Sequence, residues 1–366
     1  MCKTRDNIDV MTNILIAMSG GVDSSVAAWK MKQDGYACQG ATMTLFDAES
    51  DSTKTCCSLD DAEYARSVAY QLGIPFHVFN FREVFRKNVI ERFVNIYQTG
   101  KTPNPCIDCN RFVKFERFLR RCEELKFDYM ATGHYAQIEH DSASGRYLLK
   151  KAVDETKDQS YVLYSLTQTQ LAKVLFPLGT LRKSEVRDIA GTLGFANAQK
   201  LESQDLCFVP DGDYAAFIEW YTGKNCPPGN FVDKTGKVLG RHKGLIRYTI
   251  GQRKGLGIAA PAPYYVCNHN VEENTVILGK EDDLRVRTIT AADINLIPFD
   301  QIEGAMRAIV KVRYRQKGDW ATVRQIDSDK LEIIFDEPQK GVAKGQAAVL
   351  YDGEYVLGGG TIVFSA

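Results

Sequence analysis

Two short stretches of the sequence carry residue types that could do chemistry. The first is Ser19-Gly20-Gly21-Val22-Asp23-Ser24-Ser25, which directly follows the apolar run 14–18. Glycines leave the backbone open to an anion, and the start of a helix offers unpaired N–H groups and a partial positive charge. The lysine of a Walker-type loop is absent. The stretch therefore predicts a nucleotide-phosphate site, and a tight turn without a ligand is the alternative interpretation.

The second stretch is 102–110, which contains Cys106 and Cys109. Its two prolines indicate a stiff loop, and we expect a helix to begin near Asn110. A Cys-x-x-Cys at a helix start favours thiolate, but the spacing fits a redox pair, half a zinc site or part of an iron–sulfur site. A third cysteine, Cys207, follows a short polar segment. No second Cys-x-x-Cys or histidine pair accompanies it, which gives a four-ligand structural zinc site little support.

The elements that would position these residues alternate between short strands and helices from residue 13 to about 135. Hydrophobic periodicity and capping signals predict strands over 14–18, 36–45, 74–79 and 129–132, and helices over 24–33, 58–72, 82–97 and 112–125. This alternation predicts an α/β fold, a doubly wound parallel sheet with helices on both faces. Ligands of such sheets lie beyond the carboxyl ends of the strands, where Ser19, Met43 and Gly133 would meet.

The pattern of residues along the sequence changes near Pro210. Beyond it come short alternating strands joined by tight turns, which predict a small mixed or β domain followed by a β-barrel. A chain of 366 residues is long enough for several domains. We therefore expect an ATP-binding catalytic domain over 1–211, a central mixed/β domain over 212–284 and a C-terminal β-barrel over 285–366.

Composition excludes some classes of protein. Hydrophobic residues make up 44% and charged residues 25%, with 46 basic and 46 acidic side chains, so net charge neither supports nor excludes a nucleic-acid partner. No apolar run could span a bilayer and no signal-peptide core follows the first residues, so we expect a cytoplasmic protein with no membrane partner. Ten cysteines in such a chain favour buried thiols, metal ligands or catalysis over structural disulfides.

The two stretches are joined by further motifs in a fixed order. These are Thr132-Gly133-His134-Tyr135-Ala136, Lys157-Asp158-Gln159-Ser160-Tyr161, and the segments 203–208, 248–257 and 312–316. Together they resemble the bacterial tRNA-specific 2-thiouridylases of the PP-loop ATP pyrophosphatase superfamily over essentially the whole chain. The resemblance implies an adenine nucleotide alpha hydrolase-like catalytic domain. It also implies a sulfurtransferase that adenylates O2 of the wobble uridine (U34) with ATP and replaces it with sulfur.

The resemblance assigns residues to the ATP site. Asp23 would contact Mg²⁺, which neutralises the departing pyrophosphate. The ATP-binding residues it implies are Ala17, Met18, Ser19, Gly20, Gly21, Val22, Asp23, Ser24, Met43 and Gly133.

The resemblance also assigns the sulfur chemistry. Cys207 would carry a persulfide received from a donor protein, and Cys109 would be the nucleophile that attacks it. A Cys109–Cys207 disulfide would close and need a thiol reductant. A competing account within the family places an iron–sulfur cluster on Cys106, Cys109 and Cys207. Both remain open, and because some members carry Asp at the position of Cys106, its thiol has no obligatory role.

The tRNA partner is assigned in the same way. Four residues would lie at the target base: Asn104, Pro105, Cys106 and His134. Six more would contact the tRNA: Lys157, Asp158, Gln159, Arg313, Tyr314 and Gln346. The Arg253-Lys254 loop is a further basic candidate, since its flanking glycines allow a ligand to approach the backbone. Several of the remaining cysteines are best interpreted as packing residues without a chemical role. They are Cys38, Cys122, Cys267 and the pair Cys56-Cys57.

Two other functions fit parts of the sequence. A small-molecule adenylating ligase of the same loop class would need no set of three cysteines. A noncatalytic iron–sulfur or sulfur-carrier protein would need no ATP loop. The presence of both features on one chain disfavours each of these alternatives.

Overall fold

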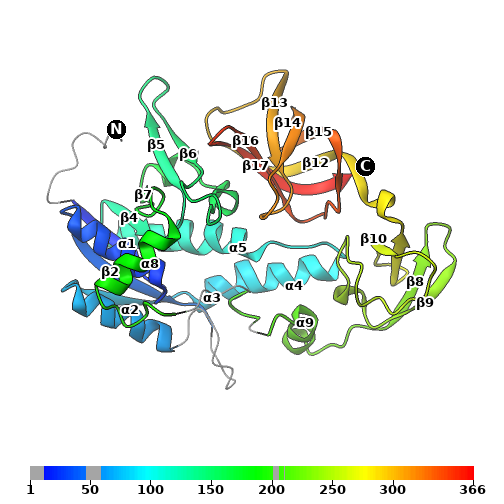
Figure 1. Cartoon of the computed structure of the whole chain (residues 1–366), viewed down its shortest axis with the longest axis horizontal. Helices are drawn as coiled ribbons and strands as arrows, with labels where there is room; N and C mark the ends of the chain where they lie inside the picture. The colour runs from blue at the N-terminus through cyan, green and yellow to red at the C-terminus, as the bar shows by residue number, and fades with distance from the viewer. Residues whose placement is uncertain (1–11, 47–58, 201–205, 210) are drawn as a thin grey trace. The chain divides into compact units, whose positions relative to one another are not determined.

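The computed structural model describes residues 12–46, 59–200, 206–209 and 211–366 (Figure 1). The chain divides into two compact units. The first unit is formed by Met1–Val89, Cys106–Pro210 and Gly353–Leu357, and the second by Ile90–Pro105, Asp211–Asp352 and Gly358–Ala366. The pair Cys56-Cys57, the expected helix start at Ser58 and the motif residues 203–205 lie outside the described residues.

The first unit is built on a parallel sheet, which confirms the α/β prediction. Its strand order is β3 (Phe76–Asn80), β2 (Ala37–Thr44), β1 (Asn13–Ala17), β4 (Tyr129–Thr132) and β7 (Val174–Leu175), and every pairing is parallel. The chain leaves β1 toward β2 and β3 and returns on its other side as β4. The carboxyl ends of β1 and β4 therefore flank a topological switch point, where such sheets bind ligands.

Helices cover both faces of this sheet because side chains of a buried strand alternate between the faces. Ile14 and Ile16 pack in one core with residues of α1 (Val22–Gln33), α2 (Leu59–Gln71) and α8 (Lys183–Thr192). On the other face, the ring of Phe118 contacts those of Phe79 and Phe81 edge-on. Phe118 ends η2 (Cys109–Phe118), which continues as α6 (Leu119–Glu124).

Three details of the first unit differ from the sequence-based expectation. The helix expected from about residue 110 begins earlier, as α5 (Pro105–Asp108), because proline suits a first helical position whose N–H has no partner. The helix expected over 82–97 is α3 (Arg82–Phe85), η1 (Arg86–Ile90) and α4 (Glu91–Gln98), and it crosses from one unit into the other. An unpredicted antiparallel hairpin follows the sheet, β5 (Gln137–Asp141) with β6 (Arg146–Lys150).

The second unit contains the β structure predicted beyond Pro210. The helix α9 (Tyr214–Thr222) precedes a small sheet with the order β10 (Tyr265–Asn270), β11 (Thr275–Gly279), β8 (Gly229–Asp233) and β9 (Val238–His242). The predicted barrel is confirmed. It consists of β12 (Arg285–Leu296), β13 (Ala305–Lys311), β14 (Asp319–Asp327), β15 (Lys330–Lys340), β16 (Ala347–Asp352) and β17 (Tyr355–Ser365), and pairing of β12 with β17 closes it.

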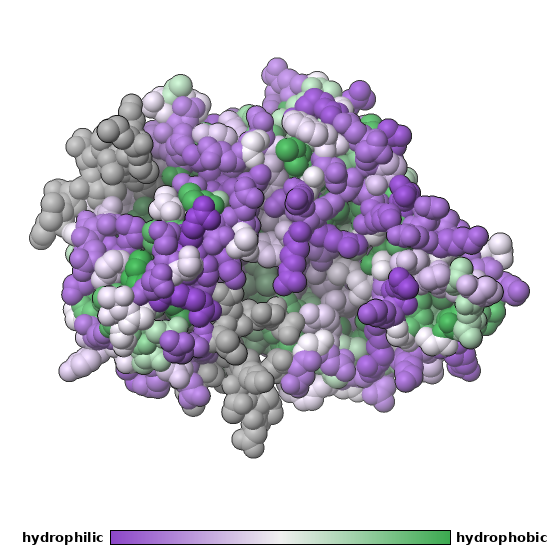
Figure 2. Space-filling model, viewed as in Figure 1, coloured by the Kyte–Doolittle hydropathy of each residue, from purple (hydrophilic) through white to green (hydrophobic). Residues whose placement is uncertain are grey.

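Surface polarity agrees with the composition. On the face drawn in Figure 2, hydrophilic residues predominate and hydrophobic ones are scattered in small groups. Within the described part of the chain, no helix has the length and apolar character needed to cross a membrane.

Candidate nucleotide and thiol site

The glycine loop joins β1 to α1 and leaves the helix start open. Gly21 occupies the N-cap position, and no side chain caps the helix. The nearby hydroxyls bond within the loop: Ser24 Oγ and Ser25 Oγ both donate to the Gly21 carbonyl, each at 3.0 Å, and Ser24 Oγ accepts from the Ser19 N–H at 3.1 Å. Because no side-chain cap occupies the first N–H groups of α1, they are available to an anion.

Two glycines are required by close backbone approaches. A Cβ on Gly20, whose φ is +77°, would lie 2.1 Å from the Asp61 carbonyl oxygen. A Cβ on Gly133 would lie 2.8 Å from both the Asp23 carbonyl carbon and the Ser24 nitrogen. The end of β4 therefore lies directly against the first turn of α1. This contact explains why Gly133, more than a hundred residues from the loop, belongs to the same site.

The Asp23 carboxylate is held by two groups that sequence analysis did not assign to the site. Its Oδ1 accepts from the Tyr135 hydroxyl at 2.7 Å and from Lys183 Nζ at 2.6 Å. Tyr135 lies in the Thr132–Ala136 motif, whose residues Gly133 and His134 were already assigned to the site, so the sequence contained a signal for it. Lys183 begins α8, and no local signal in the sequence distinguishes it from the charged residues around it.

A second layer of contacts supports the loop. Asn197 is almost fully buried, and its Nδ2 donates to the Gly20 carbonyl and to Ser25 Oγ, both at 2.9 Å. Lys200 Nζ forms an ion pair with the Asp61 carboxylate. Neither residue was predicted from sequence, because each reaches the loop from a turn more than a hundred residues away.

The remaining predicted ATP residues lie on the same sheet edge. Ala17 ends β1, and Met18 directly after it donates its N–H to the Ala41 carbonyl of β2 at 2.8 Å. Both side chains are buried, as is that of Val22. Met43 is half-buried near the carboxyl end of β2. The structure thus brings together the strand ends at residues 17, 43 and 133 that the sequence predicted to meet.

The three candidate cysteines all belong to the first unit, and α3 supports the segments of two of them. Cys109 begins η2, which packs against α3. Cys207 lies in a turn whose neighbour Phe208 packs its ring edge-on against Phe85 of α3, with centroids 5.8 Å apart. Cys106 is exposed on α5, whereas Cys109 and Cys207 are half-buried. All three are recorded as thiols and not as disulfides.

The arrangement of the thiols bears on the metal alternatives. Within the described ranges, no three His, Cys, Asp or Glu side chains come together in a way that could hold a metal ion. Of the cysteines interpreted as packing residues, Cys38 and Cys122 are buried and Cys267 is half-buried. Burial raises the pKa of Cys38 to about 11 and that of Cys122 to about 12.

His134 is buried instead of being displayed at the site edge. Its ring lies near those of Phe115 and Phe176. Its Nδ1 is 2.7 Å from Thr132 Oγ1, and its Nε2 is 3.4 Å from Lys114 Nζ. Burial holds the pKa of His134 well below its usual value, and the Lys114 ammonium lowers it further. The imidazole is therefore neutral near pH 7, with Lys114 donating to Nε2.

The predicted tRNA residues Asp158 and Gln159 both hold the protein's own backbone. Asp158 Oδ1 accepts from the N–H groups of Ala152 and Ser160, and its Oδ2 accepts from Ser160 Oγ. Gln159 Oε1 accepts from the Tyr135 N–H at 2.9 Å. The bond from Gln159 therefore secures the backbone of Tyr135, whose hydroxyl binds Asp23. Lys157, which precedes them, is half-buried.

In the second unit, Gln346 holds the start of the thiol-bearing stretch. Its Nε2 donates to the carbonyls of Thr102, at 3.1 Å, and of Pro103, at 2.9 Å. The Thr102 N–H donates to the Lys344 carbonyl at 2.8 Å. The predicted base contacts Asn104 and Pro105, half-buried and buried respectively, follow directly. Gln346 therefore fixes the backbone that leads to them.

Arg313 and Tyr314 follow β13 and are both exposed. The Arg313 Nη2 donates to the Gly341 carbonyl. An added Cβ on Gly251 would lie 3.5 Å from the same Nη2. The guanidinium is thus directed toward the glycine turn of the 248–257 motif, while 40% of Tyr314 remains exposed.

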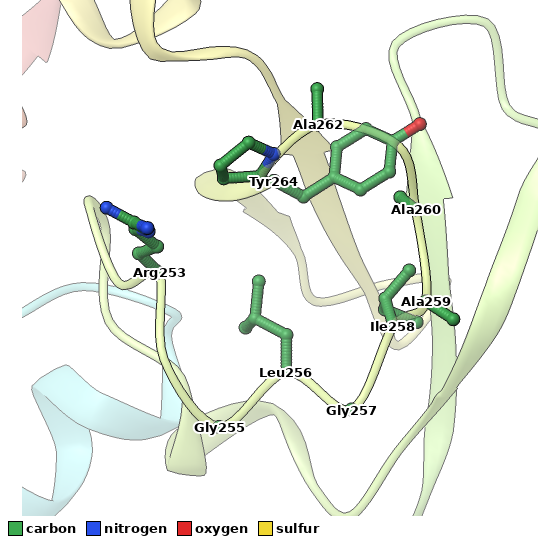
Figure 3. A pocket seen from close by; sticks show the side chains of 10 residues that line it. Arg253, Gly255, Leu256, Gly257, Ile258, Ala259, Ala260, Ala262 and Tyr264 are labelled. Atoms are coloured by element: carbon green, nitrogen blue, oxygen red, sulfur yellow. The ribbon is translucent and has the colours of Figure 1, made fainter.

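A shallow hollow of about 480 Å³ lies in the loop between residues 253 and 264 of the second unit. Figure 3 shows Arg253 and Ile258 on opposite sides of it, with Leu256 pointing between them and Tyr264 across the loop. Arg253 is exposed and helps to lower the pKa of the Glu281 carboxyl, although the nearer Lys340 ammonium has the largest effect. The hollow combines an apolar floor with a cation at its rim.

The open glycine loop at the switch point of a parallel sheet defines the first unit as a nucleotide-binding α/β domain. Family models agree along the chain. Residues 12–211 match a "tRNA methyl transferase HUP domain", residues 215–280 a "tRNA methyl transferase PRC-barrel domain" and residues 286–362 an "Aminomethyltransferase beta-barrel domain".

Individual relatives define the family more narrowly. A tRNA-specific 2-thiouridylase MnmA of Clostridioides difficile is 48% identical over 95% of this chain and 97% of its own length. Another MnmA, from Lachnoclostridium phytofermentans, is 47% identical over 96% of this chain and 100% of its own. A solved U34-tRNA thiolase NcsA from Methanococcus maripaludis matches with 17% identity and a TM-score of 0.37, over 60% of this chain and 70% of its own. The chain belongs to the family of tRNA-specific 2-thiouridylases.

The close approach at Gly133 predicts a matched pair of glycine variants. Gly133→Ala should displace the first turn of α1 and weaken ATP binding about tenfold or more, equivalent to about 1.4 kcal/mol. Gly191→Ala, in α8, meets open space and should leave ATP binding unchanged while stabilising the helix by roughly 0.5–1 kcal/mol. Calorimetric ATP titration and thermal unfolding measure both effects. Unchanged ATP affinity in Gly133→Ala would contradict the interpretation of this contact.

Proposed function

We propose that this chain is an ATP-dependent tRNA 2-thiouridylase, a sulfurtransferase that replaces O2 of the wobble uridine U34 with sulfur. One observation carries the proposal: a single compact unit holds both an open glycine loop and the two thiols Cys109 and Cys207. Replacing a carbonyl oxygen requires a good leaving group and a sulfur nucleophile. The loop and the thiols supply one requirement each, and membership of the family supports their combination.

The first step uses the glycine loop. The uridine O2 attacks the α-phosphate of ATP, and pyrophosphate is the leaving group. The open N–H groups at the start of α1 bind this pyrophosphate. Mg²⁺, when bound, would neutralise charge on the phosphates. Asp23 fits this ion because its side chain is 32% exposed and Mg²⁺ commonly takes one or two carboxylates together with substrate phosphates. Its Oδ2 has no hydrogen-bond partner among the described residues.

The second step uses the thiols. A donor protein transfers a sulfur atom to Cys207 to form a persulfide, whose terminal sulfur attacks C2 of the adenylated uridine and displaces AMP. The Cys109 thiolate then attacks Cys207 Sγ. This breaks the bond to the transferred sulfur, leaves it on C2 as 2-thiouridine and forms a Cys109–Cys207 disulfide. A thiol reductant must supply two electrons before the next turnover.

The persulfide route is the alternative that we propose, because the segments of Cys109 and Cys207 both pack on α3. An iron–sulfur cluster would instead use Cys106, Cys109 and Cys207 together as ligands. Cys106 is exposed, so we propose that it lies at the target base together with Asn104 and Pro105. His134 would affect the base site through Lys114, since Lys114 and Thr132 occupy both of its ring nitrogens.

The tRNA would contact both units. We propose that Lys157, Arg313 and Tyr314 touch it directly, and that Asp158, Gln159 and Gln346 hold the backbones that present the contacts. The hollow beside Arg253 offers a cation for a phosphate and an apolar floor for a base. In this proposal the domain 1–211 catalyses the reaction, and the domains 212–284 and 285–366 contact the tRNA. The reaction takes place in the cytoplasm.

A reconstituted reaction tests the function. The pure protein is incubated with unmodified tRNA, ATP, Mg²⁺, a persulfide-carrying donor and a reductant, and the nucleosides are analysed by mass spectrometry. Cys207→Ser should abolish 2-thiouridine and leave tRNA binding intact. Cys226→Ser changes a half-buried thiol of the second unit outside the motifs and serves as the matched control.

The outcomes separate the candidate functions. Exchange of oxygen for sulfur supports thiolation. The family models carry the words "tRNA methyl transferase", so a nucleoside heavier by one methyl group would favour that activity instead. Absence of 2-thiouridine both with and without oxygen would contradict the proposal. Bound iron with visible absorbance would favour the cluster alternative.

Arg253 provides a test of the tRNA surface. Arg253→Ala should weaken tRNA binding several-fold at low salt and reduce the slope of log affinity against log salt by about 1, because one phosphate contact is lost. Arg285→Ala, which removes an exposed arginine already paired with Asp282, should change neither quantity. Binding titrations at several salt concentrations measure both. Equal slopes for the wild type and Arg253→Ala would exclude this contact.

A further inference from the structure

The pair formed by Lys183 and Asp23 is unusual for a surface helix. Lys183 Nζ lies 2.6 Å from Asp23 Oδ1, and the exposed fractions of the two side chains are 10% and 32%. The same ammonium lies 5.8 Å from the centre of the Tyr135 ring. An ammonium removed from water in this way must be compensated by a partner, so the position of Lys183 requires an explanation.

The backbone at Lys183 is held firmly. Its N–H donates to Asp154 Oδ2 at 2.9 Å, and Asp154 Oδ1 in turn accepts from the N–H and hydroxyl of Thr156. The preceding N–H, of Arg182, donates to Glu185 Oε2 at 2.6 Å. These bonds fix the first turn of α8, so the long side chain of Lys183 reaches the glycine loop from a defined starting point.

The glycine loop itself lacks a cation. A Walker-type loop carries a lysine that reaches the transferred phosphates, and Ser19–Ser25 has none. The open N–H groups of α1 supply only partial charge. Pyrophosphate leaving from this loop would carry several negative charges, and a full positive charge held close by stabilises such a leaving group most effectively.

We propose that Lys183 is a catalytic residue that binds the pyrophosphate part of ATP, so that α8 provides the cation missing from the loop. Without nucleotide, Lys183 and Asp23 neutralise each other. When ATP binds, the ammonium moves to a phosphate oxygen, and the Asp23 carboxylate would then be able to hold Mg²⁺. Tyr135 keeps Asp23 oriented in both states. This inference rests on the proposed function for its reaction, but its binding component can be measured separately.

Pyrophosphate binding in EDTA tests the inference without tRNA and without the metal ion. Lys183→Met keeps the length of the side chain and removes its charge, and it should weaken binding of inorganic pyrophosphate at least about tenfold. Asp23→Asn should bind pyrophosphate at least as tightly as the wild type, because Lys183 is then released from its partner. Lys30→Met, which changes a half-buried α1 lysine paired with Asp34, should behave as the wild type.

A double variant separates phosphate binding from simple charge compensation. If Lys183 only balances Asp23, then Asp23→Asn with Lys183→Met should bind pyrophosphate as Asp23→Asn does, and the inference would be overturned. If Lys183 binds phosphate, the double variant should remain at least about tenfold weaker than Asp23→Asn. The double variant removes both charges of the Lys183–Asp23 pair, so the comparison remains available even if Lys183→Met alone is unstable.

Turnover gives the catalytic readout. tRNA-dependent release of AMP should fall about 100-fold in Lys183→Met, by analogy with the loss of one transition-state donor. A wild type that forms no 2-thiouridine, but whose pyrophosphate binding depends on Lys183, would contradict the proposed function and leave this inference intact. A wild type that forms 2-thiouridine while Lys183→Met binds pyrophosphate equally well would contradict this inference alone.

Discussion

The nucleotide site depends on a close approach of two backbones. The end of β4 lies against the first turn of α1, at a distance that only a residue without a Cβ permits at Gly133. A second approach, of Gly20 to the Asp61 carbonyl, sets the loop against α2 in the same way. Side chains can adapt to a neighbour, but two backbones in contact cannot, so these approaches fix where the open N–H groups of α1 point.

Polar contacts then orient the charged groups around the loop. Gln159 holds the backbone of Tyr135, the Tyr135 hydroxyl binds Asp23, and Lys183 completes the cluster from α8. The residues come from four separate parts of the sequence. Several residues expected to touch tRNA, among them Asp158 and Gln159, form hydrogen bonds within the protein. In the second unit, Gln346 has the same relation to the stretch that leads to Cys106.

The cysteines of the first unit differ in how far they are buried. Cys38 and Cys122 are buried, and their raised pKa values keep them protonated near pH 7. Cys109 and Cys207 are half-buried, and the segments that bear them both pack on α3. The proposed sulfur transfer would require a thiol that is both accessible and firmly supported. Packing of Phe208 on Phe85 holds the segment that carries Cys207 against α3.

By itself the sequence determined the α/β class, the parallel sheet, the later β domains and the glycine loop, because these depend on local periodicity and on residues without side chains. It also placed residues 17, 43 and 133 on one edge, since parallel strands share their carboxyl ends. Only the tertiary structure decided the start of α5, the β5–β6 hairpin, the burial of His134 and the joining of Lys183 to Asp23. The burial of His134 and the pair formed by Lys183 and Asp23 depend on contacts between distant segments, and a side chain's own sequence neighbours do not reveal which distant group it will meet.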